Sequence, residues 1–297
     1  MRSLLVVITL IASFGCNAQP HAPISNITAN GILDDVRWLA SDQLQGRYYR
    51  SQEARIAAKY IADKWKDAGL VPLRGSSSMY LPVDDLMASP NVAAMWPGSG
   101  DEYVLLTAHY DHLKPRRRGR DKIYNGADDN ASGTAALIAI AQAFALLQNP
   151  LDASIVVVAF TGEEAGFIGS EFFAENPPFP LRNIRGLINL DMISRGDPNT
   201  IFLEGSPDAP QISLAINKAN KRIGLTIVRD AYPDWLNRSD QAPFLDRGVP
   251  SVFLSVEDHE DYHQVTDHAD KILPDLAAKT AQLAFLTAVD LAGGGVP

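Results

Sequence analysis

Cysteine is almost absent from this chain of 297 residues: Cys16 is the only one, so no disulfide can form within the chain. The fold must therefore depend on a hydrophobic core, and a content of 46% hydrophobic residues is ample for one large core. Positive charge is also scarce. The chain has 26 Lys and Arg against 35 Asp and Glu, a net charge of −9, which argues against non-specific binding to nucleic acid.

Long apolar runs, internal repeats and low-complexity linkers are missing as well. Beyond the N-terminus, no stretch of the sequence is long and apolar enough to span a membrane. Without repeats or linkers the mature chain is predicted to form one domain, residues 19–297, and no obligate protein partner is expected.

Residues 1–18 have the pattern of a secretory signal peptide. Arg2 precedes an apolar run at residues 4–14 that is too short for a spanning helix. Two processing patterns fit. Small residues before Cys16 resemble a bacterial lipoprotein site with a lipid anchor on Cys16, although Phe14 departs from that pattern, and ordinary cleavage after Ala18 is the alternative. Both predict an exported protein, either periplasmic, membrane-anchored or secreted.

Two helices and then an alternation of strands and helices are predicted along the mature chain. Helical spacing marks residues 32–39 and 51–68, the second with Ser51 as N-cap and Gly69 as C-cap. Apolar runs predict strands at residues 92–96, 104–108, 155–160, 187–190 and 251–256. Helices are predicted near residues 132–148, 167–175, 211–223 and 274–291. This alternation predicts an α/β sandwich with a mostly parallel central sheet.

Polar clusters follow four of these strands, where ligands bind in open α/β sheets. The clusters are His109-Tyr110-Asp111-His112, Thr161-Gly162-Glu163-Glu164, Asp191, and Glu257-Asp258-His259 with Tyr262-His263. Five of the six histidines fall within residues 109–112 and 259–268. Packed carboxylates are costly unless cations neutralise them, and a His and Asp/Glu set without thiolate suits zinc or a similar divalent ion in a catalytic site.

The segment 125–133 adds two adjacent carboxylates, Asp128 and Asp129, at the start of a predicted helix. They can form an N-terminal cap cluster favoured by the helix dipole. One of them could instead bridge two metal ions.

Together, these motifs resemble the M28 family of co-catalytic zinc aminopeptidases, in an order and spacing that cover most of the mature chain. The matching segments are Leu39-Ala40-Ser41-Asp42, Gly46-Arg47, Asn91-Val92, 109–112, 126–133, Gly162-Glu163-Glu164, Asn189-Leu190-Asp191-Met192, Ser239-Asp240 and Tyr262-His263. The resemblance implies a three-layer sandwich, with a mixed and mostly parallel sheet flanked by helices as in zinc exopeptidases. It also implies two Zn²⁺ ions as cofactors.

The resemblance further implies a role for each matching residue. His109 and Asp191 would hold one zinc, Glu164 and His263 the other, and Asp129 would bridge the two. Glu163 would be the general base and acid, and Tyr262 would stabilise the tetrahedral intermediate. Asp111 would hydrogen-bond His109, and Ser239 would support His263. His112, His259 and His268 are not expected to be ligands.

The implied activity is removal of the N-terminal residue of a peptide by a zinc-activated water. A carboxypeptidase of the same family stays open, because the basic run at residues 114–120 could bind a substrate carboxylate. A glutaminyl cyclase, which shares the fold and uses one zinc, and a non-catalytic binding module on this fold stay open as well.

Overall fold

The computed structural model describes residues 23–293. The predicted signal peptide and Cys16 lie outside the described residues. Among the residues that the structure describes, no helix has the length and apolar character to cross a membrane.

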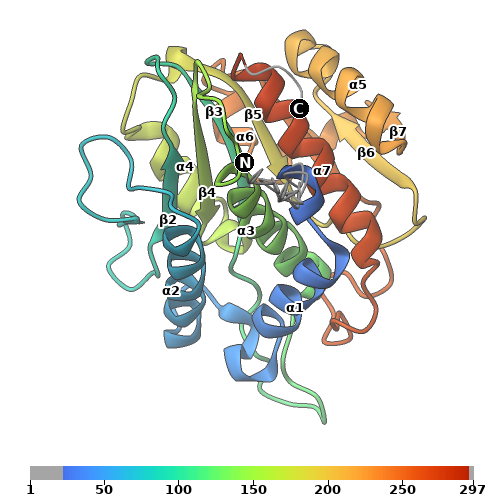
Figure 1. Ribbon diagram of the computed structural model, residues 1–297. Helices are drawn as coiled ribbons and strands as arrows, with labels where there is room; N and C mark the ends of the chain where they lie inside the picture. The colour runs from blue at the N-terminus through green and yellow to red at the C-terminus, as the bar shows by residue number, and fades with distance from the viewer. Residues whose placement is uncertain (1–22, 294–297) are drawn as a thin grey trace, which may run out of the picture.

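One eight-stranded mixed sheet forms the centre of the molecule, in the order β1-β2-β4-β3-β5-β8-β6-β7 (Figure 1). Its strands are β1 (Tyr80–Leu81), β2 (Asn91–Trp96), β3 (Tyr103–His109), β4 (Ser154–Phe160), β5 (Ile184–Leu190), β6 (Thr200–Glu204), β7 (Thr226–Arg229) and β8 (Ser251–Ser255). The central strands β4, β3, β5 and β8 are parallel, whereas β2 and β6 run antiparallel to their inner neighbours. The carboxyl ends of the four central strands therefore point to the same edge.

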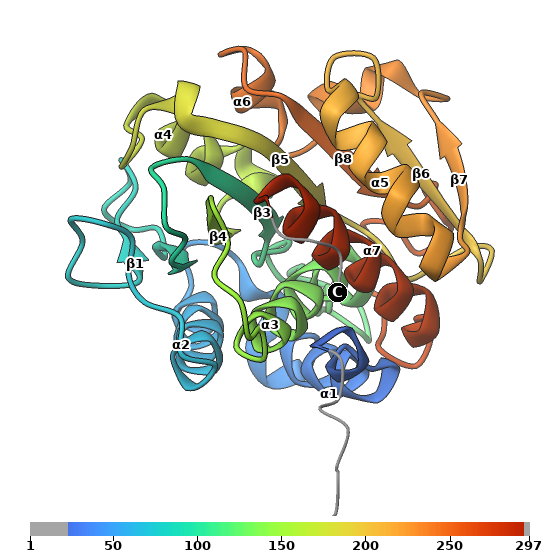
Figure 2. The same ribbon diagram turned by 45° about the horizontal axis from the view of Figure 1, so that its top comes forward.

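Helices cover both faces of the sheet. They are α1 (Ala29–Leu39), α2 (Gln52–Asp67), α3 (Gly133–Phe144), α4 (Ile168–Glu175), α5 (Pro210–Ile223), α6 (Ala242–Leu245) and α7 (Pro274–Leu291). Figure 2 shows α1, α2, α3 and α7 on one face and α4 and α6 on the other. Successive β3 residues such as Leu105 and Leu106 pack into different cores on opposite faces, as expected for a strand buried on both sides.

The predicted sandwich with its mostly parallel sheet is confirmed. The five predicted strands are present as β2, β3, β4, β5 and β8, within three residues of their expected ends. The predicted caps of α2 are also present: the Ser51 hydroxyl accepts a hydrogen bond from the Ala54 amide at 3.0 Å, and Gly69 has a φ of +82°. Strands β1, β6 and β7 were not expected from the sequence.

The core on the α3 and α7 face gives a direct test of this architecture. Leu286 of α7 is 0% exposed, whereas Leu214 of α5 is 70% exposed. We expect Leu286→Ala to lower the free energy of unfolding by about 2–5 kcal/mol because it leaves a cavity. We expect Leu214→Ala to change it by less than about 0.5 kcal/mol. Urea unfolding of both variants measures this, and equal losses would contradict the assigned packing.

Candidate metal centre

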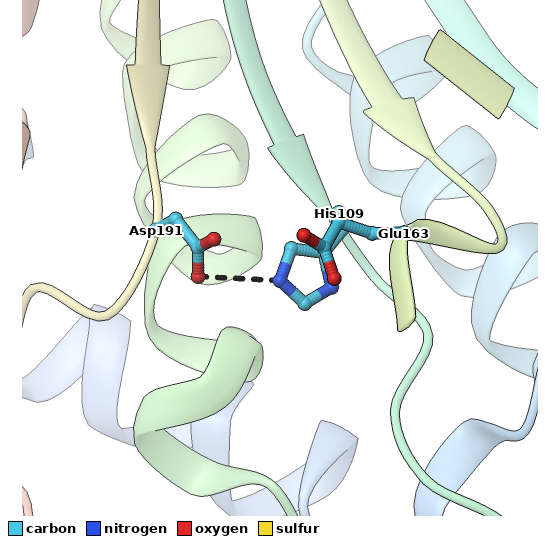
Figure 3. A group of neighbouring side chains, drawn as sticks. All are labelled: His109, Glu163 and Asp191. Atoms are coloured by element: carbon cyan, nitrogen blue, oxygen red, sulfur yellow. Dashed lines mark hydrogen bonds and ion pairs between the residues drawn. The ribbon is translucent and has the colours of Figure 1, made fainter. Parts of the chain in front are cut away.

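Three acidic and histidine side chains meet at the carboxyl ends of β3, β4 and β5. His109 is the last residue of β3, Asp191 follows β5, and Glu163 lies just beyond β4 (Figure 3). His109 Nε2 lies 3.2 Å from Asp191 Oδ1, and Glu163 offers an oxygen to the same group of atoms. All three are among the predicted site residues.

A second group lies beside the first: His112, Asp129 and Glu164 offer atoms that are close enough to share an ion, and His263, which follows β8, adjoins them. His263 Nε2 lies 3.1 Å from Glu164 Oε2. Asp129 lies between the two groups: its Oδ1 is 3.4 Å from His109 Nε2, and its Oδ2 is 3.3 Å from His263 Nε2. The two oxygens of one carboxylate thus face histidines of two different groups.

These separations have the size that a shared ion requires. Zinc binds His nitrogen and carboxylate oxygen at about 2.0–2.2 Å, so two ligands of a tetrahedral ion lie about 3.3–3.5 Å apart. The four histidine–carboxylate distances of 3.1–3.4 Å are close to that edge length. Asp129 Oδ2, which faces His263, is buried without a hydrogen bond in the part of the chain that the structure describes. The five predicted ligands therefore fit two zinc ions in composition and spacing.

The charges around the centre shift the pKa of its carboxyl groups in opposite directions. Burial raises the pKa of Glu163, His109 opposes this, and the carboxylates of Asp191, Asp240 and Glu164 raise it further, so the net pKa lies well above its ordinary value. Burial also disfavours the charged form of Asp129, but three neighbouring histidines outweigh it and lower its pKa well below the usual range. Glu163 is therefore suited to carry a proton, and Asp129 to remain a carboxylate.

The backbone around Asp129 is shaped by glycines and by one buried acid. A Cβ on Gly126 would lie 2.2 Å from the Asp129 carbonyl oxygen, and one on Gly133 would lie 2.3 Å from the Leu190 carbonyl oxygen, so only glycine fits at either position. The Asp267 carboxylate accepts hydrogen bonds from the Asp128 and Asp129 amides at 3.0 and 3.1 Å. Asp128 itself accepts from the Ser194 amide and hydroxyl, which gives it a structural role beside Asp129.

Arg47 connects the segments before and after this turn. Its fully buried guanidinium donates to the carbonyl oxygens of Tyr110, Asn125 and Gly126 at 2.8–2.9 Å, and also to that of Leu39. Burial lowers the pKa of Arg47 to about 10, and nearby carboxylates, led by that of Asp111, oppose this. The side chain remains charged at neutral pH and holds the backbone on both sides of the centre.

The basic run at residues 114–120 forms an exposed loop beside the Arg47 clamp, the set of hydrogen bonds from the Arg47 guanidinium to four carbonyl oxygens. Both ends of the loop meet over Gly46, where a Cβ would lie 2.6 Å from the carbonyl oxygens of Leu113 and Tyr124. Within the loop, the Arg116 amide donates to the Lys122 carbonyl oxygen at 3.0 Å and its Nε to that of Asp121 at 2.8 Å. Contacts between its own residues therefore close the loop on itself.

Asp111 contacts His109 as expected, whereas Ser239 supports a different ligand from the expected one. The Ser239 hydroxyl donates to Asp191 Oδ2 at 2.7 Å, so it supports Asp191 and not His263. The Asn189 amide in turn donates to Ser239 Oγ at 2.9 Å. His109 Nδ1 lies 3.1 Å from the backbone oxygen of Asp111 and 3.7 Å from its carboxylate, which also accepts from the Glu163 amide at 3.2 Å.

A pocket opens beside the centre and contains Tyr262. It is lined by Asp129, Glu163, Asp191, Met192, Trp235, Arg238, Phe253, Ser255, Val256, Asp258, Tyr262 and His263. The Tyr262 ring stacks on His263 with ring centroids 4.0 Å apart. Arg238 pairs with Asp258 at 3.0 Å and lies over the rings of Trp235 and Tyr262. The metal centre thus forms one wall of a pocket with aromatic and charged linings.

Several contributors to this site were not assigned a role from the sequence. Arg47 and Asp267 act through backbone groups, which no spacing rule identifies.

Asp240 is fully buried with both carboxylate oxygens unpartnered among residues 23–293, and burial raises its pKa to about 7. His259 lies 3.2 Å from Asp128 and His268 3.7 Å from Asp121, both away from the two groups. His112, by contrast, lies 2.6 Å from Glu164.

The Arg47 clamp can be tested apart from any metal. Lysine keeps the charge of Arg47 but cannot donate to four carbonyl oxygens, so we expect Arg47→Lys to lower the free energy of unfolding by at least about 2 kcal/mol. Arg37→Lys, at a side chain that is 62% exposed, should change it by less than about 0.5 kcal/mol. Unfolding in the presence of a chelator measures both, and an unchanged Arg47→Lys protein would rule out the clamp.

Several known proteins are similar to this chain in sequence or in fold. Leupeptin-inactivating enzyme 1 of Streptomyces exfoliatus is 25% identical over 234 residues, which cover 78% of this chain and 49% of the relative. The LapA aminopeptidase of Legionella pneumophila superposes with a TM-score of 0.76 at 17% identity, over 98% of this chain and 80% of that one. The glutaminyl cyclase of Porphyromonas gingivalis superposes with a TM-score of 0.71 at 17% identity, over 89% and 98%.

The chain spans about half the length of this relative from Streptomyces exfoliatus. The two structural matches, at their low identity, establish the fold. The model of peptidase family M28 matches residues 91–288, a region that begins at β2, ends within α7 and contains every residue of the two ligand groups. From this match and the shared fold, the chain belongs to peptidase family M28.

Proposed function

We propose that the protein is a zinc-dependent aminopeptidase with two zinc ions per chain. The observation that carries the proposal is the position of Asp129, whose two oxygens face His109 and His263 in two separate groups. A carboxylate in this position can be shared by two ions. One ion would be held by His109 and Asp191, the other by His263 and Glu164, with Asp129 common to both.

When bound, zinc would polarise the substrate carbonyl and lower the pKa of a water molecule, so that the water can attack at neutral pH. Glu163 is the side chain of the centre that is free to move a proton. It takes the proton of the attacking water and gives it to the leaving amine, which its raised pKa favours. Tyr262, at the pocket wall, donates its hydroxyl hydrogen to the carbonyl oxygen as that oxygen gains negative charge.

The pocket also supports a preference for a free amino terminus. Asp129, Glu163 and Asp191 line it with carboxylates that attract the α-ammonium group of a peptide. Trp235, Phe253 and Val256 supply apolar surface for the first side chain. Peptides with an apolar N-terminal residue are therefore the proposed substrates.

Two related activities are alternatives to the proposed one. A glutaminyl cyclase shares this fold, and such an enzyme would use a single ion, whereas the two groups around Asp129 favour two. A carboxypeptidase would need a cation for the substrate carboxylate, which the exposed basic loop could offer. Both differ from an aminopeptidase in metal content or in the end of the peptide that they require.

Metal content and activity together test the two-zinc centre. We expect two zinc ions per wild-type chain by elemental analysis, and chelator-sensitive release of N-terminal residues. Glu163→Gln should keep two ions but lose at least about 100-fold in kcat, because it cannot accept a proton. Asp129→Asn should lower zinc content and activity together. One zinc ion per wild-type chain without release of N-terminal residues would point to the cyclase chemistry, and one ion with full release would refute the two-zinc centre.

Substrate blocking tests the preference for the amino terminus. We expect N-acetylated aminoacyl-arylamides to be cleaved at least about 10-fold less efficiently than their free counterparts, as a loss of about 1.4 kcal/mol of charge attraction requires. The measurement is kcat/KM on matched pairs, with peptides blocked at the carboxyl terminus as control substrates. Equal turnover of free and acetylated substrates would refute the proposal, and turnover lost only on carboxyl blocking would indicate a carboxypeptidase.

A further inference from the structure

His112 is buried against the second ligand group, although the ligand set is complete without it. Its side chain is 0% exposed, and its ring lies 5.8 Å from the ring of His263 and 6.5 Å from that of Tyr124. A Cβ on Gly126 would lie 2.6 Å from the His112 ring, so the glycine makes room for it. The imidazole is enclosed on several sides and directed at the centre.

The nearest polar atom to this ring belongs to a predicted ligand. His112 Nδ1 lies 2.6 Å from Glu164 Oε1, and Asp129 Oδ2 is farther away at 3.7 Å. The two atoms are buried and in close contact, and neither forms an aligned hydrogen bond, with the other or with a third group, within residues 23–293. Leaving both atoms unpaired in a buried site would be costly, so each needs the other.

The distances separate two roles that a histidine could have here. Two ligands of one tetrahedral zinc ion lie about 3.3–3.5 Å apart, which Glu164 Oε2 and His263 Nε2 approach at 3.1 Å. A separation of 2.6 Å between His112 Nδ1 and Glu164 Oε1 is too short for that edge and is instead a direct contact between imidazole and carboxylate, which becomes a charge-assisted hydrogen bond once the Nδ1 hydrogen is aligned with the oxygen. His112 and Glu164 therefore do not bind the same ion side by side.

We propose that His112 is a positioning residue that donates its Nδ1 hydrogen to Glu164 Oε1 and so leaves Oε2 for the second zinc ion. The proposal rests on the two-zinc centre described above. Glu164 would bind through one oxygen only, with its plane fixed by His112 on one side and the ion on the other. Partners of this kind orient the ligands of metal sites and strengthen binding.

The same arrangement exists at the first zinc position with a different donor. There Asp191 directs Oδ1 at His109, and its Oδ2 accepts from the Ser239 hydroxyl at 2.7 Å. The carboxylates that would each bind a single ion, Asp191 and Glu164, would thus have one oxygen for the ion and one for a buried donor. Loss of His112 should consequently weaken the His263 position and leave the His109 position nearly unchanged.

Zinc affinity at each position can be measured separately. Asp191→Asn weakens the His109 position, so the tight site that remains in this variant is the one with His263. His263→Gln weakens the His263 position and leaves the one with His109. We expect His112→Leu to raise the zinc dissociation constant about 10- to 100-fold in the Asp191→Asn background, and less than about 3-fold in the His263→Gln background. Competition with a chromogenic zinc chelator gives both constants.

Two further variants separate positioning from packing. His112→Asn places an amide nitrogen, like Nδ1, two bonds from Cβ, so we expect it to recover most of the lost affinity. His268→Leu removes a half-exposed histidine outside both groups and should leave both constants unchanged. X-ray absorption at saturating zinc should count the same number of imidazole ligands in wild type and His112→Leu.

Three other outcomes would overturn the proposal. Unchanged zinc affinity in His112→Leu would mean that the contact does not position Glu164. Equal weakening at both positions, with a lower melting temperature and no recovery by asparagine, would show a packing role alone. A lower imidazole count in His112→Leu would make His112 a direct ligand. These constants need no peptidase activity, so an inactive wild-type protein would refute the proposed function without deciding the role of His112.

Discussion

The repulsion between buried carboxylates is the constraint on which this structure depends. Asp129, the adjacent pair Glu163 and Glu164, and Asp191 converge from three separate segments, and their negative charges cannot share a desolvated site without compensation. Histidines at the ends of β3 and beyond β8 lie between them, and the buried guanidinium of Arg47 adds a fixed positive charge behind them. The parallel strands at the centre of the sheet bring these groups to one edge. The candidate metal site therefore depends directly on the topology of the fold.

Around this centre, uncharged donors orient several of the carboxylates. Amides of the turn at Asp128 and Asp129 point to Asp267, and Asn189 orients the hydroxyl of Ser239. Such partners add no net charge, so they orient carboxylates without competing with a cation for them. The result is a site whose side chains are held in position before any ion arrives, which reduces the entropy lost on binding.

The sequence predicted the parts of this molecule that follow from local pattern. The strands β3, β4, β5 and β8 are continuous apolar runs, and α2 is bounded by Ser51 and Gly69. Strand β7 was not predicted, because it lies at the sheet edge and none of its side chains is buried, which leaves no apolar run to recognise. The partners of Ser239 and His112 were missed for another reason: Asp191 is 48 residues from Ser239, and only the folded sheet brings such pairs together.

The loop at residues 114–120 is held at its base, so changes at its tip need not move the residues of the metal centre. Its two ends meet over Gly46 and are tied to Arg47, so its tip can change in length or sequence without moving His109 or Asp129. Natural divergence can therefore alter what this loop touches while the chemistry stays the same. For the experimenter, the tip is an internal attachment point for a fluorophore or a tag, a few residues along the chain from the ligands yet decoupled from them.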